Sequence, residues 1–332
     1  MDPSTTASLL EIAESARARM RGHDRAAAID DLEPRYPDLM AALDRWLADG
    51  RIADADRLAT ALVPFWMATQ RIDDGDAWFA RALPEVDDPE RARAVYDHGY
   101  LVFWAGRYDL ASERFEHARA LAAGRDPTIV ALALAGSARV ALDADPREAV
   151  RLLREGLDAT EGTDDVEGRS SVTHVLGVAL QMSGDLAGAR DVMAERLTLA
   201  RVKGDDFIVW VESSNLSMVE RRLGNVDRAV ALANDALRMI STGSDEMAIA
   251  WTINGLAAAT AAQGAHQRAA TLLGLAEAML ERAGGEWPPD ERQQHDETTA
   301  LLGDALGPVA LEAARATGGA MSTPEGLAFA LP

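Results

Sequence analysis

The residue types that most often perform catalysis or bind metals occur in this chain without the spacing that would define a site. The six histidines, at positions 23, 98, 117, 174, 266 and 295, never recur four residues apart, as a zinc-binding helix face requires. Asp73, Asp74 and Asp76 surround Gly75, but the closing glutamate and spaced oxygen ligands of a calcium loop are absent, so we interpret this run as a solvated turn. We therefore predict no catalytic residue, no metal site and no cofactor, and a protein that is not an enzyme.

Composition limits the remaining chemistry. The chain has no cysteine, which excludes disulfides, thiolate metal sites and a cysteine nucleophile. Its only lysine, Lys203, lies in a Val-Lys-Gly sequence, whereas a Walker phosphate loop needs Gly-Lys-Ser or Gly-Lys-Thr. The net charge of −21 repels phosphate groups, so we predict no direct binding to nucleic acid or to anionic membranes.

The composition also predicts the fold class and the compartment. Of the 332 residues, 48% are hydrophobic but only 5% are aromatic, which favours helices over strands. A single core rarely grows beyond roughly 250–300 residues, so two domains or a repeat array are expected. No apolar run approaches the roughly 18–20 residues of a membrane helix, and the N-terminus lacks the layout of a signal peptide. We predict a cytoplasmic protein.

A repeated turn provides the elements that would position binding residues. Residues 106, 144, 184, 224 and 264 begin one short pattern at intervals of 38, 40, 40 and 40 residues, and all but Ala144 are glycine. Five residues after each start lies an alanine, at Ala111, Ala149, Ala189, Ala229 and Ala269. Seven residues before each start lies a small residue, at Gly99, Ser137, Gly177, Ser217 and Ala257. These columns predict five antiparallel helix pairs that approach closely at small residues, joined by a left-handed glycine turn.

The turn pattern resembles the tetratricopeptide repeat. Gly106-Arg-Tyr-Asp-Leu-Ala111 is the best match, and Phe115 and Ala118 follow where that family has its aromatic and small residues. The resemblance implies an all-α fold, a tetratricopeptide-like right-handed superhelix of antiparallel helix pairs. The spacing of 40 residues exceeds the family's usual 34, so we expect longer helices or loops between pairs, as at Lys203 to Asp206.

Segments near both ends extend this resemblance to a larger class of protein. Residues 29–43, 272–278, 287–292 and 324–331 look like the helical repeat region of bacterial signal-transduction ATPase transcriptional regulators of the LuxR and AfsR type. In that family the repeats accompany a nucleotide-binding domain and a DNA-binding domain, which leaves open whether this chain is a stand-alone protein or part of a regulator. We predict an N-terminal helical segment over 1–50, the repeat array over 51–283 and a C-terminal helical cap over 284–332.

The resemblance, combined with the helical period, places a stripe of residues on the inner side of the superhelix, because the first helix of each pair lines the concave surface. This groove is predicted to contain Tyr96, Tyr100, Phe103, Trp104, His174, Gln181, Ser214, Asn215, Met218, Arg221, Arg222, Trp251 and Asn254. One end of the stripe is aromatic, and its middle is polar and includes two adjacent arginines within an acidic protein.

Two interpretations of the stripe remain open. In the first, Asn215 and Asn254 hold the backbone of a peptide, Arg221 and Arg222 hold its carboxylates, and the aromatic residues form an apolar pocket. In the second, the aromatic residues only pack between helix pairs and the arginines only pair with neighbouring acids.

Two hypotheses for the function of the protein are considered. The first hypothesis is a protein- or peptide-binding module that acts as a sensor or scaffold in signalling or transcriptional regulation, with a protein, a peptide or a small acidic ligand as partner. The alternative is a small-molecule-binding protein or enzyme of secondary metabolism, with a pocket inside the closed superhelix formed by His174, Tyr100, Trp104, Gln181 and Arg221. A homodimer is a further possibility if exposed residues gather among Trp46, Trp66, Trp78, Trp104, Trp210, Trp251 and Trp287.

Overall fold

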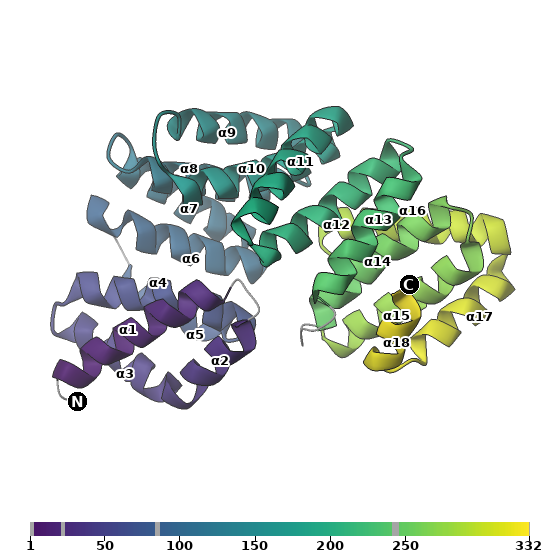
Figure 1. The fold of residues 1–332 in the computed structure, drawn as a ribbon. Coiled ribbons are helices and arrows are strands. Elements are labelled where there is room, and N and C mark those ends of the chain that lie inside the picture. The colour runs from purple at the N-terminus through teal and green to yellow at the C-terminus, as the bar shows by residue number, and fades with distance from the viewer. Residues whose placement is uncertain (1–2, 21–23, 84–86, 241–245, 332) are drawn as a thin grey trace. The chain divides into compact units, whose positions relative to one another are not determined.

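The computed structural model describes residues 3–20, 24–83, 87–240 and 246–331, and every regular element in these ranges is a helix (Figure 1). The chain divides into two compact units, residues 1–179 and 180–332, and the division falls within helix α10. Within the described ranges, no helix is both long enough and apolar enough to cross a bilayer.

The first unit begins with short helices and continues into regular pairs. Its elements are α1 (Pro3–Arg19), α2 (Arg25–Leu32), a 3-10 turn (Glu33–Arg35), α3 (Tyr36–Ala48), α4 (Ile52–Ala68), α5 (Ile72–Ala82), a second 3-10 turn (Pro89–Arg91), α6 (Ala92–Trp104), α7 (Tyr108–Ala122), α8 (Pro127–Ala141), α9 (Pro146–Ala159) and most of α10 (Val166–Ser183).

The second unit contains the remaining pairs and the closing helices. Its elements are α11 (Leu186–Lys203), α12 (Asp206–Arg222), α13 (Val226–Ile240), α14 (Glu246–Ala262), α15 (His266–Arg282), α16 (Pro289–Leu306), α17 (Pro308–Gly319) and α18 (Thr323–Ala330). Figure 1 shows α17 and α18 lying beside α15, which both of them contact.

The five predicted turns each join two helices. Gly106, Gly184, Gly224 and Gly264 have φ angles of 74°, 90°, 83° and 84°, in the left-handed region that glycine adopts without a steric penalty. The extra residues of the 40-residue spacing lengthen helices: α11 runs to Lys203, and α12 starts three residues later. Several helix starts follow from an aspartate whose side chain accepts a hydrogen bond from a backbone amide of the first turn, at Asp126, Asp145, Asp185 and Asp205.

The column of small residues has a direct packing role in the first unit. The ring of Phe115 lies against Gly99 and Gly136, where an added Cβ would lie 2.9 Å from Arg114 and 2.6 Å from Phe115, respectively. Phe115 is fully buried in a core that also contains Trp46, Trp66 and Trp78. Gly99 of the predicted column and Gly136, which directly precedes the column residue Ser137, therefore bring α6 and α8 onto one aromatic side chain.

The acidic run at Asp73–Asp76 corrects one expectation. It belongs to the first turns of α5 and not to a solvated turn, since the chain reverses earlier, where Gln70 has a φ of 57°. Acidic residues at a helix N-terminus are favoured by the helix dipole, which explains the earlier start. Asp74 accepts a hydrogen bond from the hydroxyl of Tyr36 at 2.7 Å, so the run connects helices. The predicted boundaries at 50/51 and 283/284 fall between helices, and the three-part division stays a prediction.

Candidate functional site

Four of the predicted groove residues form a continuous aromatic row along α6. Tyr96, Tyr100 and Trp104 are four residues apart and therefore share one helix face. The ring centroids of Tyr96 and Tyr100 are 6.1 Å apart, and those of Tyr100 and Trp104 are 6.2 Å apart. Exposure rises along the row, from 7% at Tyr96 to 43% at Trp104.

The exposed end of the row is a three-ring corner at the turn between α6 and α7. The ring of Phe103 lies 5.4 Å from that of Trp104 and 5.5 Å from that of Tyr108, the first residue of α7. Tyr108 is 54% exposed. We call Tyr96, Tyr100, Phe103, Trp104 and Tyr108 the aromatic ladder. Sequence reasoning used Tyr108 only as part of the turn signature, although its position beside Phe103 follows from that turn.

Charged residues lie near the buried end of the ladder. Arg93 pairs with Asp97 at 3.1 Å and with Glu167 of α10 at 3.0 Å, and Thr60 donates to Asp97 at 2.6 Å. Burial raises the pKa of Tyr96, so its phenol stays protonated, while the positive charge of Arg139 on α8 opposes that rise. Within the described ranges the Arg139 side chain has no hydrogen-bond or ion-pair partner, and Arg139 is only half-buried.

The predicted stripe is divided between the two units. His174 belongs to the first unit and lies half-buried on α10. In the second unit Gln181 and Met218 are both buried, and the Gln181 amide lies 2.8 Å from the Met218 sulfur, so these two side chains pack on each other. Ser214 and Asn215 are half-buried on α12, and Trp251 donates to the carbonyl oxygen of Glu286 at 3.3 Å.

The remaining three predicted residues contact the chain's own helix α16. Arg221 and Arg222 on α12 reach the two carboxylate oxygens of Glu297 at 3.1 and 3.3 Å. Asn254 on α14 is fully buried and donates to the carboxylate of Glu291 at 2.7 Å and to its backbone carbonyl at 3.2 Å. We call Arg221, Arg222 and Asn254 the Arg–Asn surface. The sequence predicts that these residues hold the carbonyl and carboxylates of a ligand. In the structure they hold a carbonyl and carboxylates of this chain.

Glu291 has unusual electrostatics. Burial raises the pKa of its carboxyl group to about 8, and the negative charge of Asp290 adds to the rise. Hydrogen bonds from Asn254 and Gln294 and the charge of Arg221 favour the ionised form and limit the effect. Near neutral pH this side chain is therefore largely protonated where it contacts the Arg–Asn surface.

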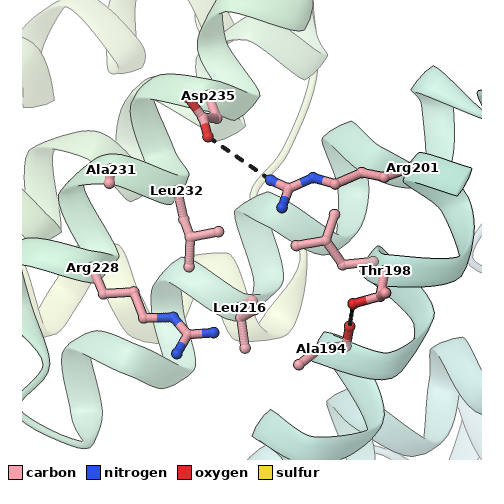
Figure 2. Close-up of a pocket in the computed structure, with 9 residues that line it drawn as sticks. Ala194, Thr198, Arg201, Leu216, Arg228, Ala231, Leu232 and Asp235 are labelled. Carbon is pink, nitrogen blue, oxygen red and sulfur yellow. Dashed lines mark hydrogen bonds and ion pairs between the residues drawn. The ribbon is translucent and has the colours of Figure 1, made fainter.

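The second unit also contains a small hollow, shown in Figure 2, with a volume of about 250 Å³. Arg201 and Asp235 face each other across it with their charged groups 3.8 Å apart. Its other lining residues come from α11, α12 and α13: Ala194, Leu197, Thr198, Leu216, Arg228, Ala231 and Leu232. None of the residues predicted for a small-molecule pocket lines it. Among the described residues, no three His, Asp or Glu side chains are grouped so that they could hold a metal ion.

The seven tryptophans do not share one environment. Trp46, Trp66 and Trp78 are buried, and Trp104 is exposed on the aromatic ladder. Trp210, Trp251 and Trp287 are half-buried, and Trp210 donates to Thr252 at 2.9 Å. The homodimer stays a prediction.

Comparison with known proteins places this geometry in context. No protein-family model matches the chain. Over 238 residues it is 26% identical to proteins of Mycobacterium bovis and Mycobacterium tuberculosis whose names describe them as HTH-type transcriptional regulators. The match covers 67% of this chain and 26% of each regulator, so it spans about a quarter of the length of these relatives.

Solved structures share the fold at low sequence identity. NprR in complex with its cognate peptide NprX is 12% identical with a TM-score of 0.56, covering 92% of this chain and 86% of that one. A signal transduction ATPase with a tetratricopeptide repeat sensor from Pyrococcus horikoshii is 12% identical with a TM-score of 0.57, covering 94% and 51%. Cut9 in the APC/C hetero-tetramer Cut9–Hcn1 is 16% identical with a TM-score of 0.53, covering 92% and 57%. The chain thus has the all-helical fold of a tetratricopeptide repeat protein, as its turns predict.

Proposed function

We propose that this chain is a peptide-binding sensor region of a cytoplasmic regulatory protein, and that it binds its partner without catalysing a reaction. The aromatic ladder carries the proposal. Large exposed aromatic side chains are enriched among the residues that dominate binding energy, because they bury a large apolar area at a small loss of side-chain entropy. The ladder presents Trp104 and Tyr108 to solvent while Tyr96 anchors its other end in the core.

The neighbouring charges indicate the kind of peptide. Tyr100 and Trp104 offer ring faces and edges on which an apolar or aromatic side chain can stack. The guanidinium of Arg139 has no partner in the described part of the chain, and this group binds carboxylates through two parallel hydrogen bonds. We therefore expect a peptide with an apolar side chain and, within one or two residues, a carboxylate.

The comparisons support this proposal at the level of fold and regulation. NprR was solved with a peptide, and the mycobacterial relatives are named as transcriptional regulators. The small-molecule alternative is less favoured, since the hollow of Figure 2 is lined by none of the residues predicted to form such a pocket.

The test is a selection of random phage-displayed peptides on the immobilised full chain. Enriched peptides are then synthesised, and their dissociation constants are measured by fluorescence anisotropy. Trp104→Ala is expected to weaken binding about tenfold or more. Phe207→Ala is the matched control, because Phe207 is 40% exposed and contacts the ring of Trp210 edge-on within the second unit. Peptides that bind Trp104→Ala as tightly as the wild type would exclude the ladder as the site.

A further inference from the structure

Helix α16 buries an unusual stripe of residues against the second unit. Its most buried side chains are Glu291, Gln294, Thr298 and Leu302, with exposures of 8%, 1%, 3% and 0%. Their spacing of three, four and four residues defines one helix face. Three of the four are polar, so the N-terminal part of α16 docks through hydrogen bonds and ion pairs as well as through apolar contacts.

The partners of this stripe lie on two different helix pairs. Asn254 on α14 holds the carboxylate and the backbone carbonyl of Glu291. Arg221 and Arg222 on α12, one full pair earlier in the chain, hold Glu297. A backbone carbonyl held by an asparagine and a carboxylate held by two arginines are the contacts by which a polar surface binds a peptide in trans.

This polar contact is incompletely satisfied. Asn254 Oδ1, Gln294 Oε1 and Arg221 Nε are buried and have no hydrogen-bond partner among the described residues. A buried polar atom without a partner opposes the docked state, because it has lost its bond to water. The ion pairs to Glu297 add little, since the Glu297 side chain is 41% exposed and the pairs are screened by solvent. The N-terminal half of α16 is therefore docked with a smaller free energy than its buried area would suggest.

The neighbouring helix α17 is held by a different and stronger contact. A Cβ at Gly318 would lie 1.9 Å from the carbonyl oxygen of Thr271, and one at Gly274 would lie 2.1 Å from that of Arg315. The backbones of α15 and α17 are thus in direct contact. Two helices packed this closely cannot separate by a small distance without losing most of their contacts. Release of α16 would leave α17 in place.

We propose that the Arg–Asn surface is a second peptide-binding surface, and that α16 is its internal ligand, displaced by an acidic partner segment. The partner presents two acidic side chains at the spacing of Glu291 and Glu297, and it supplies a donor to Asn254 Oδ1 and an acceptor to Arg221 Nε. This inference deepens the proposed peptide-binding function and rests on it, but it concerns different residues from the aromatic ladder.

The experiment uses one labelled probe, a synthetic peptide with the sequence of residues 287–302, and the full-length chain. In Glu297→Ala the internal copy loses its ion pairs, so the probe should bind about two- to fivefold more tightly than to wild type, because more of the surface is free. Glu312→Ala is the matched control, since Glu312 pairs with Arg315 on α17 and is 75% exposed. A probe with glutamine in place of both glutamates should lose the gain.

Hydrogen exchange on the same variants gives an independent readout. Glu297→Ala should speed exchange over α16 and leave α17 unchanged, whereas Glu312→Ala should leave α16 unchanged. Equal probe affinity for wild type and Glu297→Ala, or unchanged exchange over α16, would overturn the inference. Trp104→Ala should not alter probe binding, so failure at the aromatic ladder and failure at the Arg–Asn surface are distinguishable.

Discussion

The side-chain amide of Asn254 donates to both the carboxylate and the backbone carbonyl of Glu291, at 2.7 and 3.2 Å. One asparagine of α14 thereby fixes both the position and the backbone orientation of the first turn of α16. Because Asn254 is fully buried and Glu291 is nearly so, we expect the protonation state of Glu291 to affect how firmly α16 is docked.

Raising the pH should loosen α16. The carboxyl group of Glu291 has a pKa of about 8 when docked and 4.5 otherwise, so the docked state binds more protons between these values. Its stability is complete below pH 4.5 and is lost as the pH rises through about 8. Hydrogen exchange over α16 measured from pH 5 to 9, corrected for the intrinsic rate, should show this decline. Glu291→Gln should flatten the profile, and an equally steep profile in that variant would contradict the assignment.

His295 should add a second, smaller pH dependence in the same direction. It lies 2.7 Å from Glu277 of α15, and this hydrogen bond raises its pKa above 6.5, followed by a smaller contribution from Asp296. The contact stabilises docking below pH 6.5 and weakens as the pH rises through the higher docked value. His295→Gln should remove about 1 kcal/mol or less of the change in docking free energy above pH 6.5. NMR titration of His295 would check its pKa directly, and a value below 6.5 would refute this prediction.

Two neighbouring glycines should respond in opposite ways to alanine. Gly318→Ala places a methyl group against the carbonyl of Thr271 and should lower the free energy of unfolding by about 2 kcal/mol or more. Gly319→Ala meets its nearest atom at 3.6 Å and should be neutral or stabilise the helix by about 0.5–1 kcal/mol. Urea denaturation of both variants tests the contrast. Similar losses in the two would show that the α15–α17 contact is not made through the backbone.

Two tryptophans should separate binding from stability. Trp104 is 43% exposed, so Trp104→Ala should lower the free energy of unfolding by about 1 kcal/mol or less. Trp46 is 1% exposed, and Trp46→Ala should lower it by about 3–5 kcal/mol. Chemical denaturation of the two variants supplies the values. A large loss at Trp104 would assign the ladder a structural role and weaken the case for binding.

Much of the fold could be predicted from the sequence, because the repeat is encoded locally. The glycine at each turn and the small residues on the facing helices are steric requirements, so their spacing alone placed the five helix pairs. Local signals still leave small errors at helix starts. The acidic run at Asp73 was misplaced because acidic residues suit both a turn and a helix start.

The sequence predicts which chemical groups the candidate site contacts, but it does not identify the residues that provide those groups. Asn254, Arg221 and Arg222 were expected to hold the carbonyl and carboxylates of a ligand, whereas in the structure they hold those of Glu291 and Glu297. The chain has 54 acidic residues, and nothing local identifies these two as the partners. The buried stripe of α16 resembles a solvated face, because Glu291, Gln294 and Thr298 are residue types that usually face water. Whether the predicted groove residues bind a ligand stays a prediction.

The anchoring of α17 on α15 sets a threshold for any ligand of the Arg–Asn surface. Because α16 is joined at one end to α15 and at the other to a helix that stays in place, a released α16 remains tethered beside its own site. Its effective concentration there is on the order of millimolar, as for any segment on a short linker. A partner must compete with this tethered segment through the ratio of its concentration to its dissociation constant. Weakly binding acidic peptides present well below a millimolar concentration would leave α16 docked, and only a strong ligand would displace it.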